Sequence, residues 1–228
     1  MMGGIATDYD GRVITDENKK SFPGLYAAGE CACVSVHGAN RLGCNSLLDT
    51  LVFGRRTGKE IKSYIDSEKQ PKFAPERVKE ITDPVSGLLA SDGKENPGEI
   101  LVELQKTMMD HVSVFRTKDG LEKAISIIEK LDNRYRNVRL VDQGCCFNRN
   151  LLDILELGHM LDLAKTITLG ALAREESRGA HYREDFRQRD DKKFLHHTMF
   201  RYTGAGEKPE HFTKEVSITR FEPKERKY

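Results

Sequence analysis

The side chains best suited to chemistry lie just after a short apolar run at residues 24–28. The run is apolar on both faces, which predicts a strand buried inside a parallel or mixed sheet. It leads to the carboxylate of Glu30, and a loop containing Arg41 then reaches Ser46 at the start of a second apolar run. Ligands bind where parallel strands end, and a helix N-terminus offers unpaired amides and a partial positive charge. The segment therefore predicts a site for an anionic or electron-rich ligand.

The loop between the two apolar runs carries glycines on either side of Arg41, at positions 38 and 43. Because they lack side chains, these glycines would let the backbone approach a flat ring closely. The guanidinium fork of Arg41 is suited to hold a carboxylate by two parallel hydrogen bonds. The residues alone leave an alternative, in which Arg41 lies on the surface and the glycines only make turns.

Composition and charge narrow the classes of protein to consider. The 228 residues are 38% hydrophobic and 32% charged, with a net charge of +1. These values are typical of a globular chain with well-solvated helices, and the interleaved charges give no reason to expect nucleic acid as a partner. The first residues do not form a signal peptide, and no apolar run reaches the roughly 20 residues of a membrane span.

The chain contains five cysteines at C-x-C and C-C spacings: Cys31, Cys33, Cys44, Cys145 and Cys146. An odd number at these spacings fits neither a disulfide framework nor a C-x-x-C zinc pair. We therefore expect a reduced, intracellular chain in which the cysteines are small buried hydrophobic residues.

The chain divides into two parts around residues 68–97, a stretch that contains four of its prolines. Residues 1–67 are expected to form the end of an α/β domain. Residues 98–228 contain three runs of apolar positions at helical spacing, which predict an antiparallel helical bundle with short connections. The tail after residue 178 is polar and irregular, and alternation at residues 216–219 predicts one late strand. The predicted fold class is α+β.

One further helix is predicted in the first part of the chain. Asn45 or Ser46 before an apolar run is typical of an N-cap, so a helix should start near Ser46 and extend toward Ile65. Gly54 and Gly58 lie within that span and suggest close packing against a neighbouring element.

Several separated motifs carry a family resemblance. In the first part they are M-G-G-I at 2–5, G-L-Y-A-A-G-E at 24–30, H-G-A-N-R-L-G at 37–43 and N-S-L at 45–47. In the second part they are E-S-R-G-A-H at 176–181, D-D-K-K-F-L-H-H-T at 190–198 and R-K-Y at 226–228. Together they resemble the C-terminal part of the FAD-carrying subunit of succinate dehydrogenases and fumarate reductases, over essentially the whole chain. L-aspartate oxidases share much of the first stretch, and the later motifs favour the dehydrogenase branch.

The resemblance implies roles in FAD binding for four residues. Glu30 would bind FAD through hydroxyls of its ribityl or ribose part. Asn45, Ser46 and Leu47 at the helix start would contact the flavin, with backbone amides at the pyrimidine edge of the ring. The positive end of a helix at this edge stabilises negative charge on the reduced ring and so raises its potential.

The resemblance also implies roles in substrate binding. Arg41 would clamp a carboxylate of succinate or fumarate and so position its central C–C bond for hydride transfer. His37 lies beside this site and acts either as a residue that structures the loop or as a ligand contact.

Other elements of the family pattern do not occur in the chain. They are the dinucleotide fingerprint G-x-G-x-x-G, the histidine that commonly carries FAD covalently and the arginine that shuttles the proton. No catalytic residue is therefore assigned. We expect a chain that by itself neither holds FAD tightly nor oxidises succinate.

The resemblance implies partners and a location as well. An iron–sulfur subunit would receive the electrons and pass them to quinone, and membrane anchor subunits would take part indirectly. The chain would then lie on the cytoplasmic side of the cell membrane as a peripheral part of a membrane-bound complex. Two alternatives remain: part of an L-aspartate oxidase-like flavoenzyme, and a non-catalytic helical interaction domain.

Other polar residues have simpler interpretations. His111 is expected to be a partly exposed helix residue, and the mixed charges at 183–191 are expected to form a solvated face that an iron–sulfur subunit could use as an interface. His181, His196 and His197 are spaced unlike any common zinc site, so no metal is predicted.

Overall fold

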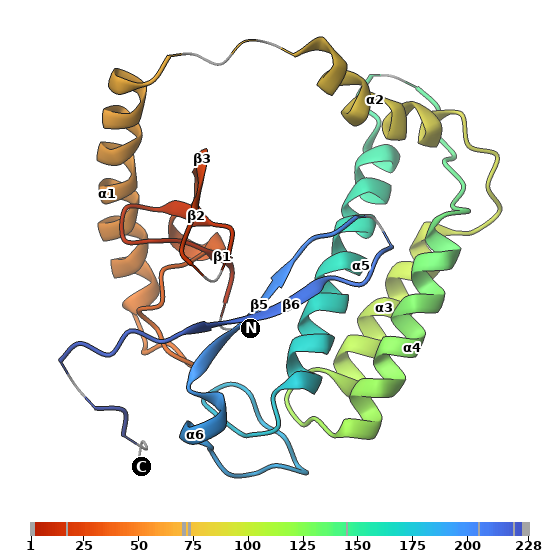
Figure 1. Ribbon diagram of the computed structural model, residues 1–228. Coiled ribbons are helices and arrows are strands. Elements are labelled where there is room, and N and C mark those ends of the chain that lie inside the picture. Colours follow the sequence, from red (N-terminus) through yellow and green to blue (C-terminus); the bar gives the residue numbers. More distant parts are fainter. Residues whose placement is uncertain are drawn as a thin grey trace.

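The computed structural model describes residues 3–16, 18–69, 72, 74–144, 146–204, 206–220 and 222–224. Three features named above lie outside this part of the chain: Met2 of the M-G-G-I motif, Cys145, and the R-K-Y motif at 226–228. Figure 1 shows short strands beside a long helix, a bundle of helices, and a tail that runs from the bundle toward the strands. The predicted α+β class is confirmed.

Short strands make up the start of the chain, and they pair two by two. β1 (Ile5–Ala6) pairs in parallel with β4 (Ala32–Cys33), and β2 (Arg12–Ile14) pairs antiparallel with β3 (Ser21–Tyr26). A single turn of 3-10 helix, η1 (Gly29–Cys31), separates β3 from β4.

The prediction of a buried strand at residues 24–28 is wrong. β3 ends at Tyr26, lies in a two-stranded antiparallel ribbon, and exposes residues 22–25. The apolar side chains are exposed because β2 covers one edge of β3 and neither of its faces.

The long helix α1 (Asn45–Ser67) begins and ends close to where the sequence predicts. Its N-cap is Cys44, which has a left-handed φ of 67° and makes no side-chain capping hydrogen bond. The expected Asn or Ser cap is therefore wrong. The first turn of α1 begins without a side-chain acceptor for its amides.

The packing of α1 against the strands uses Thr57 and not the helix glycines. Among the residues of α1, Thr57 alone is buried, and a Cβ at Gly11, whose φ is +81°, would overlap its side chain. No atom in the described part of the chain lies within 4 Å of a Cβ built at Gly54 or Gly58. The expected close packing at those two glycines is therefore not found there.

A helix occupies half of the stretch predicted as a boundary between the two parts. α2 (Pro75–Leu89) lies within residues 68–97, and its final leucines, Leu88 and Leu89, pack on the bundle core. Pro75 begins this helix and Pro97 begins the next, because a missing amide costs nothing at the first helical position. The division into domains at 1–67 and 98–228 stays a prediction.

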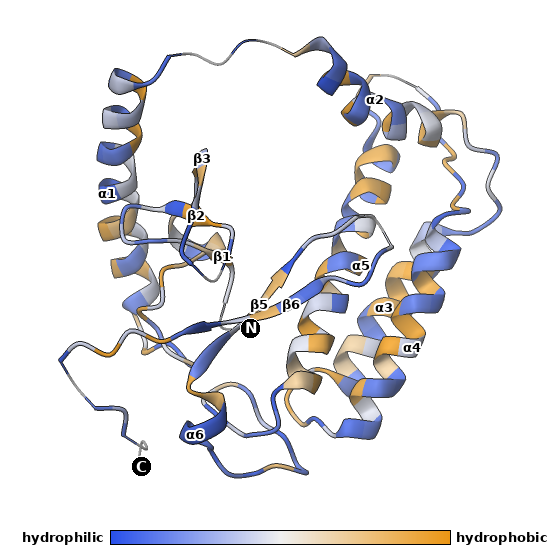
Figure 2. Cartoon of the chain, in the orientation of Figure 1, coloured by the Kyte–Doolittle hydropathy of each residue, from blue (hydrophilic) through white to orange (hydrophobic). Residues whose placement is uncertain are grey.

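Three helices form the predicted antiparallel bundle: α3 (Pro97–His111), α4 (Lys118–Tyr135) and α5 (Arg149–Ala173) (Figure 1). A side chain caps the start of each helix, from Asn96, Thr117 and Asn148 respectively. Apolar residues gather where the three helices face one another (Figure 2). The main core consists of Ile100, Leu104, Ile128, Leu131, Val138, Leu140, Ile154, Leu157, Leu161 and Ala164. Within the described residues, no helix is both long and apolar enough to cross a bilayer.

The tail forms a short helix and a hairpin: α6 (Asp191–Phe194), β5 (His196–Arg201) and β6 (Glu210–Glu215). The predicted late strand at residues 216–219 is wrong, because β6 ends where its pairing with β5 ends, at His196 and Glu215. Both strands have mixed polar sequences, so a strand's alternation of apolar and polar residues is weak in them. Their pairing with each other selects the strand positions.

The four cysteines in the described part of the chain lie outside the core. Cys31, Cys44 and Cys146 are exposed and Cys33 is half-buried, so the expectation of buried cysteines is wrong for these four. They are exposed because they lie in η1, in the loops before α1 and α5, and at the edge of the strands. His111 is half-buried at the end of α3, as expected.

The charged run at 183–191 is more than a solvated face, because Arg183 is only 1% exposed. Its Nη1 donates to the carbonyl of Ala171 in the last turn of α5 at 3.0 Å, and its Nε and Nη2 pair with Asp185 at 2.8 Å. Arg183 therefore satisfies a carbonyl at the end of α5. Its hydrogen bonds hold the pKa of Asp185 at about 2, below the usual value.

Glu176 is fully buried, and both of its carboxylate oxygens accept two hydrogen bonds. Oε1 accepts from Arg174 Nη1 at 2.5 Å and Arg178 Nε at 2.7 Å, while Oε2 accepts from Arg178 Nη2 and the amide of Asp190, both at 2.9 Å. Burial alone would raise the pKa of Glu176, but these hydrogen bonds outweigh it and lower the pKa. The carboxylate joins the end of α5 to the start of α6.

His181 is held between two other parts of this network. Its Nδ1 accepts from Arg116 Nη1 at 2.7 Å, so its Nε2 carries the proton and donates to the carbonyl of Arg174 at 3.0 Å. Burial, together with the charges of Arg116, Arg174 and Arg183, lowers the pKa of His181 to about 4. The ring is therefore neutral at pH 7.

We expect the substitution Ile154→Ala to lower the free energy of unfolding by about 3 kcal/mol, because it leaves a cavity in the bundle core. Ile154 is fully buried, whereas Leu152 on the same helix is 57% exposed. The control Leu152→Ala should therefore cost less than about 1 kcal/mol. Denaturant unfolding measures both values, and equal effects would contradict the assigned core.

Acidification should destabilise the tail through His181. Between its unfolded pKa of 6.5 and its folded pKa of about 4, the unfolded state binds the extra proton. The free energy of unfolding therefore falls as pH decreases through this range. The substitution His181→Gln removes this contribution, so unfolding curves between pH 7 and 4 should show a shallower dependence on pH. An unchanged slope would show that His181 is not held neutral.

Candidate functional site

The structure brings two of the predicted site residues together at the start of the loop. Glu30 lies in η1 with 81% of its side chain exposed, and Arg41 donates from Nη1 to Glu30 Oε1 at 3.3 Å. An exposed pair of this kind contributes little to stability. Breaking this one contact therefore costs little.

The start of α1 supplies the three other residues predicted to bind a flavin. The backbone amide of Leu47 donates to the carbonyl of Cys44 at 3.2 Å, and that of Asn45 donates to Leu42 at 3.2 Å. In the described part of the chain, no hydrogen bond from the Ser46 amide is found. The helix thus begins with an open amide and no side-chain cap, a geometry that accepts an electron-rich group.

This helix start fits a flavin in a second respect. The side chain of Leu47 is 70% exposed and those of Leu42 and Leu48 are 54% and 61% exposed, all close to the open amide. A flavin has a broad apolar ring with a polar edge, so it needs apolar contact and hydrogen-bond donors side by side. The residues present at this helix start offer both.

His37 is fixed from one side by a residue that the sequence did not single out. Its Nε2 lies 2.8 Å from Oδ2 of Asp49, which stands one turn into α1 with a side chain only 10% exposed. His37 Nδ1 is buried and has no hydrogen-bond partner among the described residues. The pairing ties the loop to α1, and the unpaired Nδ1 is enclosed by protein in this arrangement. Asp49 could have been found from its position one helical turn after Asn45.

The tail reaches the loop at two further points that sequence reasoning missed. Ser35 Oγ lies 2.8 Å from Nε2 of His197 on β5. The amide of Ala180 donates to the carbonyl of Ala39 at 3.0 Å, so the motifs at 37–43 and 176–181 meet in space. The one signal in the sequence is that both segments carry recognisable motifs, and nothing in their spacing predicts this contact.

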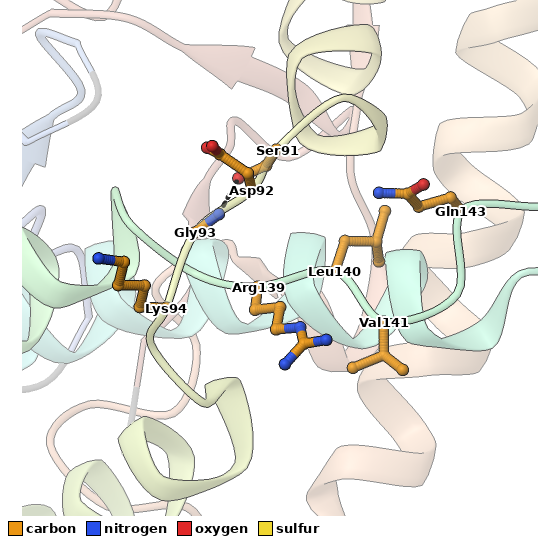
Figure 3. Close-up of a pocket in the computed structure, with 8 residues that line it drawn as sticks. All are labelled: Ser91, Asp92, Gly93, Lys94, Arg139, Leu140, Val141 and Gln143. Atoms are coloured by element: carbon orange, nitrogen blue, oxygen red, sulfur yellow. Dashed lines mark hydrogen bonds between the residues drawn. The ribbon is translucent and has the colours of Figure 1, made fainter.

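A surface hollow lies in a different part of the molecule, between the segment after α2 and the segment after α4 (Figure 3). Figure 3 shows polar and charged side chains around it, and none of them belongs to the predicted site. Its lining residues are Ser91, Asp92, Gly93, Lys94, Arg139, Leu140, Val141 and Gln143.

Metal ligands do not gather anywhere in the part of the chain that the structure describes. No group of three His, Cys, Asp or Glu side chains has the geometry to hold a metal ion there. His181 uses both ring nitrogens in hydrogen bonds, and His197 uses Nε2 with Ser35.

Family models match both parts of the chain. A model described as the fumarate reductase flavoprotein C-terminal region matches residues 102–228. A model described as an FAD-binding domain matches residues 1–47.

Curated relatives match along nearly the whole chain. The succinate dehydrogenase flavoprotein subunit of Rickettsia bellii is 39% identical over 90% of this chain and 35% of its own length. The mitochondrial succinate dehydrogenase flavoprotein subunit of Oryza sativa is 37% identical, and the fumarate reductase flavoprotein subunit of Mycobacterium tuberculosis is 38% identical, each over 100% of this chain. The chain covers 38% and 39% of those two proteins, so it spans just over a third of the relatives it matches.

Solved structures show the same likeness. An E. coli quinol fumarate reductase superposes with a TM-score of 0.90 at 35% identity, over 98% of this chain and 38% of that one. A Mycobacterium smegmatis Sdh1 complex gives 0.84 at 33% identity, over 96% and 36%. The adenylylsulfate reductase of Archaeoglobus fulgidus gives 0.67 at 21% identity, over 86% of this chain and 32% of that one, which shows a shared fold alone. This chain therefore belongs to the family of succinate dehydrogenase and fumarate reductase flavoprotein subunits.

Proposed function

We propose that this chain is part of an FAD-carrying subunit that interconverts succinate and fumarate. The observation that carries the proposal is the juxtaposition of Arg41, Glu30 and the uncapped start of α1 around one loop. A cation for a carboxylate and one open amide, that of Ser46, for an electron-rich ring edge then belong to the same loop and the helix start that follows it. Membership of the family supports the same reaction.

Four residues of the chain would hold FAD. Glu30, exposed in η1 between β3 and β4, would accept hydrogen bonds from hydroxyls of the cofactor. Asn45, Ser46 and Leu47 present the first turn of α1, whose amides and positive end favour an electron-rich ring edge. When bound, FAD would supply the acceptor for a hydride, which carries the two electrons of the oxidation.

Arg41 would bind one carboxylate of the dicarboxylate and orient its central C–C bond. A guanidinium matches a carboxylate through two parallel hydrogen bonds, which restricts both the position and the rotation of the substrate. His37, tied to Asp49, stands four residues earlier on the same loop, and a contact with the substrate would require its buried Nδ1 to become accessible. In this proposal these residues would bind and orient the substrate, and no proton transfer is assigned to them.

The exposed apolar faces of the first part of the chain support an assembly with more protein. Leu47, Leu51 and Ile65 on α1 are 67% to 72% exposed, and Phe22 and Leu25 on β3 are about half exposed. Soluble proteins cover apolar surface of this extent with other elements or partners. We propose that further parts of the same subunit cover it, since the relatives are more than twice as long.

The proposal extends to the partners of the complete subunit. Electrons would pass to an iron–sulfur subunit and then to quinone, with membrane anchor subunits bound indirectly. The complex would lie peripherally on the cytoplasmic side of the cell membrane. The names of the solved relatives, which include quinol–fumarate reductases, support this assignment.

Substrate preference tests the proposal. The full-length subunit should reduce an artificial dye with succinate and not with L-aspartate, which would identify an L-aspartate oxidase instead. The 228-residue chain by itself should neither retain stoichiometric FAD nor turn over. Tight flavin with dye reduction by the isolated chain would contradict that part, and stable folding of residues 98–175 alone without any flavin effect would favour a helical interaction domain.

The substitution Arg41→Gln in the full-length subunit should lower kcat/KM for succinate by about two to three orders of magnitude, because a bidentate charged contact is lost. Flavin absorbance should be retained, since Glu30 and the start of α1 are unchanged. The matched control Arg55→Gln changes an exposed arginine on α1 and should leave both values unaltered. Steady-state kinetics with a dye acceptor measures the difference, and an unchanged KM in Arg41→Gln would remove Arg41 from the site.

A further inference from the structure

A turn in the tail, at residues 178–181, touches the loop that carries Arg41. The amide of Ala180 donates to the carbonyl of Ala39 at 3.0 Å, two residues before Arg41. We propose that this turn positions Arg41 for dicarboxylate binding, which makes Gly179 a positioning residue that does not itself touch the substrate. The inference rests on the proposed role of Arg41.

The contact between the turn and the loop requires a glycine at position 179. Gly179 has a φ of +58°, a left-handed conformation that favours glycine. A Cβ built on it would lie 2.5 Å from the oxygen and 2.6 Å from the carbonyl carbon of Ala39. Any side chain at this position must therefore push the loop away or break the hydrogen bond to Ala39.

The turn is rigid enough to hold the loop because both of its ends are fixed. Arg178 and His181 exchange two backbone hydrogen bonds of 2.8 and 3.0 Å. The Arg178 side chain binds both oxygens of buried Glu176, at 2.7 and 2.9 Å, and donates to Asp191 at 2.7 Å. The hydrogen-bond network of the tail therefore fixes the two residues that flank Gly179 and Ala180, and it is Gly179 and Ala180 that contact the loop.

Two other described residues of the loop have side chains tied to other elements, apart from Arg41 itself, and both are farther from Arg41 along the chain than Ala39 is. Ser35 is tied to His197, and His37 is tied to Asp49. Ala39 is the nearest of the three to Arg41 in sequence, so a displacement at Ala39 moves the backbone of Arg41 most directly. Because a misplacement of about 1 Å can cost a hundredfold in rate, a small retreat of the loop is sufficient.

The test uses the full-length subunit assembled with its partner subunits. Malonate, a dicarboxylate without the oxidisable central C–C bond, is titrated while flavin absorbance is followed, so that flavin-free molecules give no signal. The substitution Gly179→Ala should weaken malonate binding and raise the KM for succinate by about tenfold or more. The matched control is Gly204→Ala, another tail glycine at positive φ, where a Cβ meets, among the described residues, the flexible side chain of Glu207 at 3.4 Å and no backbone. It should leave malonate binding within about twofold of the parent.

A second pair of variants tests the support beneath the turn without a steric clash. Arg178→Lys keeps the charge but loses the bidentate contact to Glu176, and Arg178→Ala loses both. The dissociation constant for malonate should increase from the parent to Arg178→Lys and again to Arg178→Ala. KM should follow it more closely than kcat does, a pattern that loss of stability alone does not produce.

The possible outcomes separate a failure of the positioning role from a failure of the proposed function. If the parent binds malonate and the flavin-loaded Gly179 and Arg178 variants bind it equally well, the positioning role is overturned. If Gly179→Ala retains no flavin, the ranking of the two Arg178 variants decides in its place, and equal affinities overturn the role. If the parent itself neither binds malonate nor oxidises succinate, the proposed function fails, and that result is distinct from a failure of the inference.

Discussion

The saturation of one buried carboxylate, Glu176, underlies the arrangement of the tail. A buried charge is tolerated only when it is paired and fully hydrogen-bonded, and both Glu176 oxygens accept two donors. Those donors come from Arg174 at the end of α5, Arg178 in the turn, and the Asp190 amide before α6. All four hydrogen bonds form together when the end of α5, the turn and the start of α6 are placed as they are in this structure. The tail is therefore ordered by polar geometry, where the bundle is ordered by apolar packing.

The molecule combines a helical bundle that has its own core with an exposed loop that carries the predicted site residues. The bundle buries its apolar residues in its own core, and each of its three helices starts at a side-chain cap. The loop between β4 and α1 has no such core, and it is held by polar contacts at Ser35, His37 and Ala39. Binding residues commonly lie on loops that a rigid scaffold positions. Here the tail connects the scaffold to the loop.

The exposed faces of β3 and α1 have the opposite character. Their apolar residues stay exposed among the described residues. In a family whose members are more than twice as long, such faces are where further polypeptide is expected to pack. The open amide at Ser46 belongs to the same surface, so cofactor and additional protein would meet at the start of α1.

Features that depend on local interactions were determined by the sequence, and features that depend on long-range contacts were decided only by the tertiary structure. Helical periodicity and terminal signals are local, so the bundle helices, with core residues such as Ile154 and Leu157, and the span of α1 were predictable from sequence. The motifs likewise pointed to Glu30, Arg41 and Ser46. The burial of Arg183, the β5–β6 hairpin and the contact of Gly179 with Ala39 were not predictable. Each depends on residues that meet only after the chain has folded, and a charged run or a polar strand carries no local signal of its distant partner.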